Sequence, residues 1–193
     1  MKDMALLYYF LGLEIWKIDG ELFLSQKKYA KDIMRKFHME LNKPMETPLA
    51  GNWRKEDATS GEVVDATAYK KLVGSLMYLV NTRPDICYAI KQLSKAMVNP
   101  TKLFWKAGKH VLRYLRGTTE YGLWYIWTKG VKFQGFTNAD WEGSPSNRNS
   151  TSGGIFSIGS TVVSWYNRKQ QSVALISVEE EYMATIQVAC KAI

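Results

Sequence analysis

The segment from Gln134 to Tyr182 constrains this 193-residue chain more than any other part does. It places polar and acidic residues at the end of one expected strand and at the start of one expected helix. The strand run ends in Thr137 to Asp140, and the helix opens on Glu179 to Glu181. Carboxylates that meet from a strand and a helix can share Mg²⁺ ions. The pattern therefore indicates a nuclease-like site for divalent metal.

The first part of the chain predicts a β-hairpin followed by an amphipathic helix. The apolar run Leu6 to Ile18 meets Asp19-Gly20, a strong tight-turn dipeptide, and Glu21 to Leu24 returns as the second strand. Ser25 is then expected to cap a helix over Gln26 to Phe37. Apolar residues in this stretch follow helical spacing and lysines and arginines take the remaining positions, which predicts a basic outer side.

The middle of the chain predicts an irregular loop and three helices. Periodicity is lost from Asn42 to Asp65, where prolines and glycines gather. Helices are expected over Ala66 to Asn81, Pro84 to Val98 and Pro100 to Arg116, with both prolines in first turns. Gly117 is expected to cap the last of them.

Beyond Gly117 the pattern becomes strand-like, and the expected elements are four strands and a closing helix. They are Gly122 to Thr128, Lys132 to Thr137, Gly154 to Ile158, Thr161 to Trp165 and the helix Val178 to Ala192. An antiparallel meander followed by a helix begins some α/β folds. We therefore expect an α+β chain with a domain boundary near residues 117–121.

A surplus of 26 basic over 18 acidic residues gives a formal net charge of +8, which favours polyanionic partners such as nucleic acid. The clearest basic stripe lies on the third expected helix, where five residues recur at helical spacing: Lys102, Lys106, Lys109, Arg113 and Arg116. Such a stripe can follow phosphates, and it can equally be a solvated helix face.

Cys87 and Cys190 suggest neither a disulfide framework nor zinc ligands. Neither a signal peptide nor an 18-residue apolar run is present, so we expect an intracellular protein, cytoplasmic or nuclear, without a membrane partner.

Five motifs in the second half resemble the ribonuclease H domain of copia-type retrotransposon Pol polyproteins. Their usual wording is close to T-D-A-D-W-A-G, D-R-K-S-T-S-G, S-W, K-K-Q and T-E-A-E-Y. The counterparts stand in the same order at Thr137 to Gly143, Arg148 to Gly153, Ser164 to Trp165, Arg168 to Gln170 and Val178 to Tyr182. The opening residues and the run Tyr69 to Met97 also resemble the same polyproteins, after the polymerase active site.

This resemblance implies an architecture and a function for each half of the chain. Residues 1–117 would be the C-terminal reverse transcriptase segment, with a hairpin and thumb and connection helices. Residues 118–193 would be a partial, truncated ribonuclease H-like α/β domain. The ancestral role would be RNA-directed DNA synthesis with cleavage of RNA in RNA/DNA hybrids, and the partners would be a hybrid or primer-template and the rest of the polyprotein.

The resemblance also assigns site residues, and it departs from the family at the catalytic ones. The first catalytic Asp falls on Asn138, the second carboxylate falls on the retained Glu181, and a third is expected beyond Ile193. Asp140, two places after Asn138, is a possible substitute ligand. A neutral amide offers one carbonyl oxygen and no charge, so Mg²⁺, the metal of the family, is not expected to bind productively here.

Two further positions are expected to contact nucleic acid. Gly12 matches the hairpin that grips the primer in reverse transcriptases, although a glycine in a strand can also mark only a bulge. Arg148 lies beside a Ser/Thr turn that can face a phosphate backbone. The polymerase Asp pair does not occur in the sequence, so we expect the chain alone neither to polymerise nor to cleave. Two alternatives remain open: a non-catalytic nucleic-acid-binding module and a translated relic without function.

Overall fold

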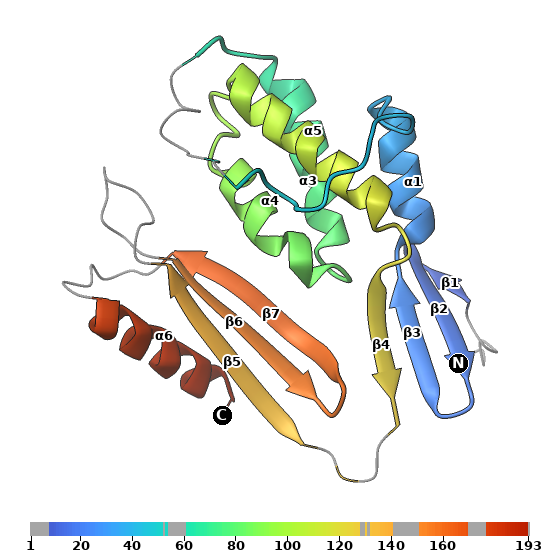
Figure 1. Ribbon diagram of the computed structural model, residues 1–193, viewed down its shortest axis with the longest axis vertical. Coiled ribbons are helices and arrows are strands. Elements are labelled where there is room, and N and C mark those ends of the chain that lie inside the picture. The colour runs from blue at the N-terminus through green and yellow to red at the C-terminus, as the bar shows by residue number, and fades with distance from the viewer. Residues whose placement is uncertain are drawn as a thin grey trace, which may run out of the picture. The chain divides into compact units, whose positions relative to one another are not determined.

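The computed structural model describes residues 8–51, 53, 61–127, 130, 132–140, 151–169 and 177–192. The chain forms two compact units, Met1–Trp124 and Tyr125–Ile193. Both contain helices and antiparallel strands, as the α+β expectation requires (Figure 1). The functional boundary expected at residues 117–118 stays a prediction. The structural division comes later, after Trp124, because strand β4 joins the sheet of the first unit.

The first unit opens with a sheet in the order β1-β2-β3-β4, formed by Tyr9–Phe10, Leu13–Ile18, Glu21–Ser25 and Gly122–Ile126. The hairpin at Asp19-Gly20 is confirmed, with Ile18 opposite Glu21 and Gly20 at φ +78°. The single strand expected over Leu6 to Ile18 is interrupted. Leu11 and Gly12 form a two-residue turn with φ of 47° and 78°, the backbone of a type I′ turn, which favours glycine.

Four helices and one 3₁₀ turn pack beside this sheet (Figure 1). They are α1 Lys27–Lys36, α3 Ala66–Leu79, η1 Pro84–Ile86, α4 Cys87–Ser94 and α5 Lys102–Gly117. Fully buried side chains from three of the helices, among them Leu72, Leu76, Leu93 and Leu112, form one continuous core. The apolar periodicity that predicted these helices therefore marks the faces that pack together.

The helix expected to reach Val98 ends at Ser94. At three other expected helix ends, a residue distant in sequence lies at the end and the expected cap or first turn is wrong. Ser25 does not cap α1: the carboxylate of Glu14, on β2, accepts the Lys28 N–H at 2.6 Å. Pro100 precedes α5, whose N-cap is Thr101, since residues 62–64 pair with residues 100–102. Gly117 is the last residue of α5 and not its cap, and a Cβ there would lie 3.1 Å from Pro44 Cβ.

A buried ion pair ties the 3₁₀ turn to the end of α5. The side chain of Arg83 is 4% exposed and donates from Nη2 to Asp85 Oδ2 at 2.7 Å and from Nη1 to the Thr118 carbonyl at 2.8 Å. Tyr114 also donates to Asp85 Oδ2, at 2.8 Å. Burial raises the pKa of Asp85, but the hydrogen bonds and charge of Arg83, together with hydrogen bonds from Tyr114 and the Asp85 backbone, outweigh this effect and lower the pKa. Burial and Asp85 together raise the pKa of Tyr114 to about 12.

The second unit is a three-stranded antiparallel sheet in the order β5-β6-β7, with one helix (Figure 1). The strands are Phe133–Asp140, Thr151–Ile158 and Thr161–Lys169, and the helix is α6, Ser177–Ala192. On the face toward α6, a Cβ at Gly135 would lie 3.1 Å from Val188, so glycine lets the helix approach the sheet. On the other face Phe136 lies opposite Ile155, and these side chains are 56% and 40% exposed.

Candidate nucleic-acid interface and catalytic strand end

The turn at Gly12 is fastened to helix α3 through one aromatic side chain. The Tyr78 hydroxyl donates to the Leu11 carbonyl, and the Tyr78 ring lies 3.3 Å from the position of a Cβ at Gly12. A larger residue at position 12 would therefore strain the backbone and push Tyr78 away. The structure gives Gly12 a role in a turn that contacts a helix, and not the role of a strand bulge.

Helix α3 continues this surface with an exposed face that carries a glycine and two lysines, and the sequence analysis did not identify it. Gly74 precedes Tyr78 by one helical turn, is exposed, and would have nothing within 4 Å of an added Cβ. Lys70 and Lys71, one turn earlier, are also exposed. Glycine inside a helix costs about 1 kcal/mol relative to alanine. The signal available in the sequence was this glycine inside an otherwise regular helical pattern, where a glycine usually has a packing or functional reason.

The basic stripe on α5 is only partly available to a ligand. Arg113 Nε donates to the Lys43 carbonyl at 2.7 Å, and Arg116 donates to the Asn42 carbonyl. Lys102 forms an ion pair with Glu62 at 2.9 Å. The two arginines therefore fasten the loop after α1 onto α5, and both of these bonds go to backbone carbonyls.

Two lysines of the stripe are less engaged. Lys106 is exposed, and the Lys109 ammonium lies 5.7 Å from the centre of the Trp105 ring, over its face. A cation over a ring keeps its charge and can still meet a phosphate. Of the five basic residues, Lys106 and Lys109 are the ones that the structure leaves best placed for an anion.

The residues expected at the nuclease site lie at one end of the second sheet. Figure 1 shows α6 beginning near the end of β5 and running back along it. Gly135 on β5 lies against Val188 on α6. Asn138 follows Gly135 by three residues on the strand, and Glu181 precedes Val188 by seven residues on the helix. Both steps are about 10 Å in length, so both residues lie toward the same end. Both side chains are exposed.

This end of the sheet does not assemble a metal centre from the described residues. Residues of β5 alternate between faces, so Asn138 lies on the face opposite to Gly135, on which α6 packs. No group of three or more His, Cys, Asp or Glu residues is placed to hold a metal ion in the described part of the chain. Asp140 pairs through its backbone with Thr151, at the strand end. Arg148 lies outside the described residues.

Among the residues whose side chains the structure describes, this strand end offers one amide and one carboxylate, which do not fit two Mg²⁺ ions. A pair of divalent ions needs several anionic oxygens to offset its charge, whereas the Asn138 amide is neutral and Glu181 supplies one carboxylate. These two groups therefore do not supply the ligands that two-metal hydrolysis needs. The local structure that remains is a hydrogen-bonded strand end, with Thr137 Oγ1 donating to the Gly153 carbonyl at 3.1 Å.

The chain is similar to several curated proteins over nearly its whole length. It is 37% identical over 182 residues to the retrovirus-related Pol polyprotein from transposon RE2 of Arabidopsis thaliana, which covers 94% of this chain and 12% of that protein. It is also 37% identical over 196 residues to the corresponding polyprotein from transposon TNT 1-94 of Nicotiana tabacum, covering 97% of this chain and 15% of that protein. An uncharacterized mitochondrial protein of Arabidopsis thaliana is 38% identical over 184 residues, covering 95% of this chain and 76% of that protein. This chain belongs to the copia-type retrotransposon Pol polyprotein family.

The family membership confirms the resemblance found in the motifs, and it applies to one part of a much longer protein. The chain spans 12% of the length of the RE2 polyprotein. No family model matches, and no solved structure matches. Within the described residues, no helix combines the length and the apolar character needed to cross a membrane.

Proposed function

We propose that this Pol-family chain is the end of a reverse transcriptase followed by the first part of a ribonuclease H-like domain. Its role is to hold an RNA/DNA hybrid or a primer-template through the first unit. By itself it neither extends a primer nor cuts RNA. The fastening of the Gly12 turn to α3 by Tyr78 is the observation that carries this proposal.

That fastening makes one surface from two elements that are far apart in sequence. Gly12 has no side chain, and the Tyr78 ring fills the space that a Cβ would take there, whereas exposed Gly74, one helical turn before Tyr78, faces open space. A nucleic-acid backbone can approach such a surface closely. Lys70 and Lys71 supply positive charge on the same helix, one turn from Gly74. The α5 residues Lys102, Lys106, Lys109, Arg113 and Arg116 are proposed as a second phosphate contact, in which Lys106 and Lys109 contribute most.

The proposed inactivity follows from the ligands at the second sheet. Loss of charge at Asn138 removes the carboxylate that would bridge two ions. Catalysis by two metal ions depends on both attacking and leaving oxygens being clamped, so a single Glu181 carboxylate leaves little of that stabilisation. This part of the proposal is independent of nucleic-acid binding.

The test is binding of the purified chain to a fluorescent RNA/DNA hybrid across a salt series, with Mg²⁺ present and the hybrid checked for cutting afterwards. We expect salt-dependent binding without cleavage. The double variants Lys70→Gln/Lys71→Gln and Lys106→Gln/Lys109→Gln should each flatten the salt dependence, by about one unit of slope for each phosphate that is no longer neutralised. The matched control removes two exposed charges from α1, Lys31→Gln/Lys36→Gln, and should have a smaller effect.

A variant without a charge change separates close approach from electrostatics. Gly74→Gln should weaken hybrid binding while the thermal unfolding of the chain is preserved, because its side chain would fill the open space on α3. Unchanged binding in this variant and in the Lys70/Lys71 pair would refute the proposed surface. Mg²⁺-dependent cleavage that Glu181→Gln abolishes would refute the proposed inactivity.

A further inference from the structure

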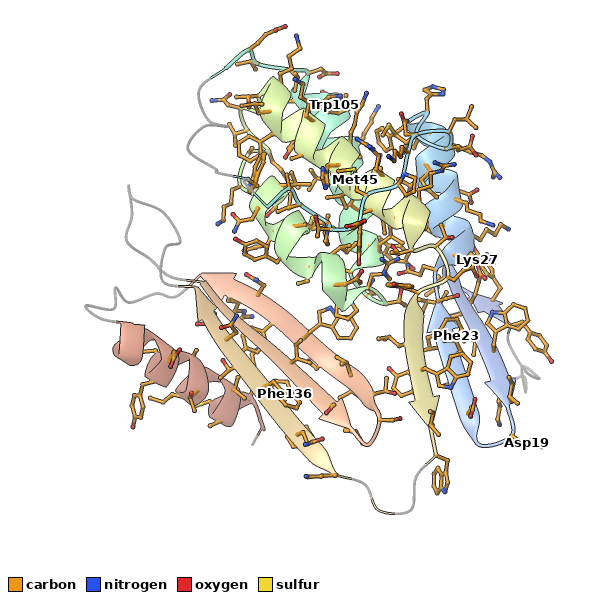
Figure 2. The ribbon with its side chains drawn as sticks, in the orientation of Figure 1. Asp19, Phe23, Lys27, Met45, Trp105 and Phe136 are labelled. Carbon is orange, nitrogen blue, oxygen red and sulfur yellow. The ribbon has the colours of Figure 1, made fainter. Side chains whose placement is uncertain are left out.

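An open cavity of about 290 Å³ lies on one face of the first sheet, and its lining includes neither Gly12 nor any residue of α3 or α5. Its lining includes three aromatic side chains, Trp16, Phe23 and Trp124, and three charged ones, Glu14, Lys27 and Glu120. Figure 2 shows Phe23 on the sheet and Lys27 at the end where α1 begins. The proposed function assigns no role to this cavity.

The aromatic side chains form a row across three neighbouring strands. Trp16 on β2 lies directly opposite Phe23 on β3, and the Phe23 and Trp124 ring centres are 5.0 Å apart. Trp124 donates from Nε1 to Glu21 Oε2 at 3.1 Å, which fixes the orientation of its ring. Trp16 and Trp124 are nevertheless 57% and 45% exposed. The hydrogen bond holds the Trp124 ring, and both indoles are exposed, so the row offers flat ring surfaces for stacking against a flat group.

The charges at the cavity have the opposite sign to the chain as a whole. Lys27 and Glu120 neutralise each other in an ion pair of 2.7 Å. Glu14 accepts the Lys28 N–H through Oε1, while its Oε2 has no partner among the described residues. The lining therefore carries one net negative charge in a chain of formal charge +8. The lining charge disfavours a phosphate, whereas a cation can contact the indole faces of Trp16 and Trp124 and the Glu14 carboxylate.

We propose that this cavity binds an arginine side chain presented by a partner peptide segment. A guanidinium is planar and weakly hydrated, so it stacks on an indole face more readily than a lysine ammonium does. Its fork of donors can reach the Glu14 carboxylate while the ring faces hold its plane. The cavity is a binding site for a cation on a protein whose other proposed surfaces bind anions.

The test uses a fluorescein-labelled peptide that carries three arginines separated by glycine and serine, titrated with the full chain and followed by fluorescence anisotropy. Its control is the same peptide with citrulline in place of arginine, which keeps the shape and removes the charge. Because the chain itself is strongly basic, general electrostatics oppose the arginine peptide, so tighter binding of that peptide reports a specific site. We expect the citrulline peptide to bind at least about tenfold more weakly.

Matched variants locate the site. Trp16→Ala should weaken arginine-peptide binding about tenfold, whereas Trp127→Ala removes an indole that is 82% exposed and outside the cavity lining and should leave it unchanged. Glu14→Gln keeps an oxygen that can accept the Lys28 N–H and removes the charge, so it should weaken binding, whereas Glu40→Gln should not.

Each contrary result has a clear meaning. Equal binding of the arginine and citrulline peptides, or binding that Trp16→Ala leaves unchanged, overturns the proposal. If a short single-stranded oligonucleotide displaces the peptide, and its own binding is lost in Trp16→Ala, the cavity stacks nucleic-acid bases and the arginine proposal is overturned. Hybrid binding by the chain is measured separately through Lys70 and Lys71, so failure here leaves the proposed function intact.

Discussion

Replacing Arg83 by glutamine is expected to destabilise the first unit by about 3–5 kcal/mol, because it removes one partner of a buried ion pair. The Arg83 side chain is 4% exposed, and Asp85 is 30% exposed. The substitution leaves the Asp85 carboxylate and the Thr118 carbonyl without the donors that Arg83 supplies. Such a loss is a large fraction of the roughly 5–15 kcal/mol that stabilises a typical folded protein.

The assay is urea unfolding followed by circular dichroism at 222 nm, where most of the signal comes from the helices of the first unit. With a denaturant slope of about 1–3 kcal/mol per molar, the midpoint should fall by at least about 1 M. The matched control is Arg35→Gln. Arg35 pairs with Asp32 and Glu40 on the surface, where its side chain is 62% exposed. That change should cost less than about 1 kcal/mol.

A double-mutant cycle with Asp85→Asn separates the ion pair from general damage. We expect a coupling free energy above about 1.5 kcal/mol between positions 83 and 85. The pH dependence has a defined sign: the folded-state pKa of Asp85 is lowered, so its stabilising contribution is present above its unfolded-state pKa and is lost as pH falls through the folded-state value. Arg83→Gln should reduce this acid dependence, because the largest causes that lower the pKa are lost. Additive effects, or a cost for Arg83→Gln no larger than for Arg35→Gln, would refute the reasoning.

Three further outcomes can be measured on the same chain. Gly108→Ala should destabilise it by about 1–3 kcal/mol in urea, because the new Cβ would lie 2.7 Å from Cδ2 of Leu72, a fully buried side chain in the packed core. Gly74→Ala, in open space on α3, should instead stabilise it by roughly 0.5–1 kcal/mol, and a loss of stability there would contradict the assignment of that surface. Cys190 is exposed, whereas burial raises the pKa of the Cys87 thiol. Chains that keep only one cysteine should therefore react with a thiol reagent at pH 8 faster through Cys190, and equal rates would argue against the packing of α4.

Local sequence signals predicted the type of nearly every described element in the first unit. The Asp19-Gly20 turn needs only a glycine that accepts a positive φ, and the helices need only apolar residues at a period of 3.6. The helix ends were predicted less well, because contacts distant in sequence determine them. Glu14 caps α1 from a strand, and the segment before α3 pairs with residues 100–102 at the start of α5.

The candidate sites show the same division. The motifs at Asn138 and Glu181 indicated the family from the sequence, and the relatives confirm it. Spacing alone could not show that Arg113 and Arg116 would be used to fasten a loop. It also could not show that Tyr78 would join the Gly12 turn to α3, 67 residues away in sequence.

The sequence by itself determined the elements, the family and the loss of charge at position 138, because each is a property of a residue or of a short periodic pattern. Tertiary structure decided which basic side chains of the α5 stripe are available to a phosphate. A carbonyl or carboxylate from a distant segment binds some of them, and the helical spacing alone does not show this. It also decided that Trp16, Phe23 and Trp124 form one row, because strand pairing brings together residues that lie up to 108 positions apart.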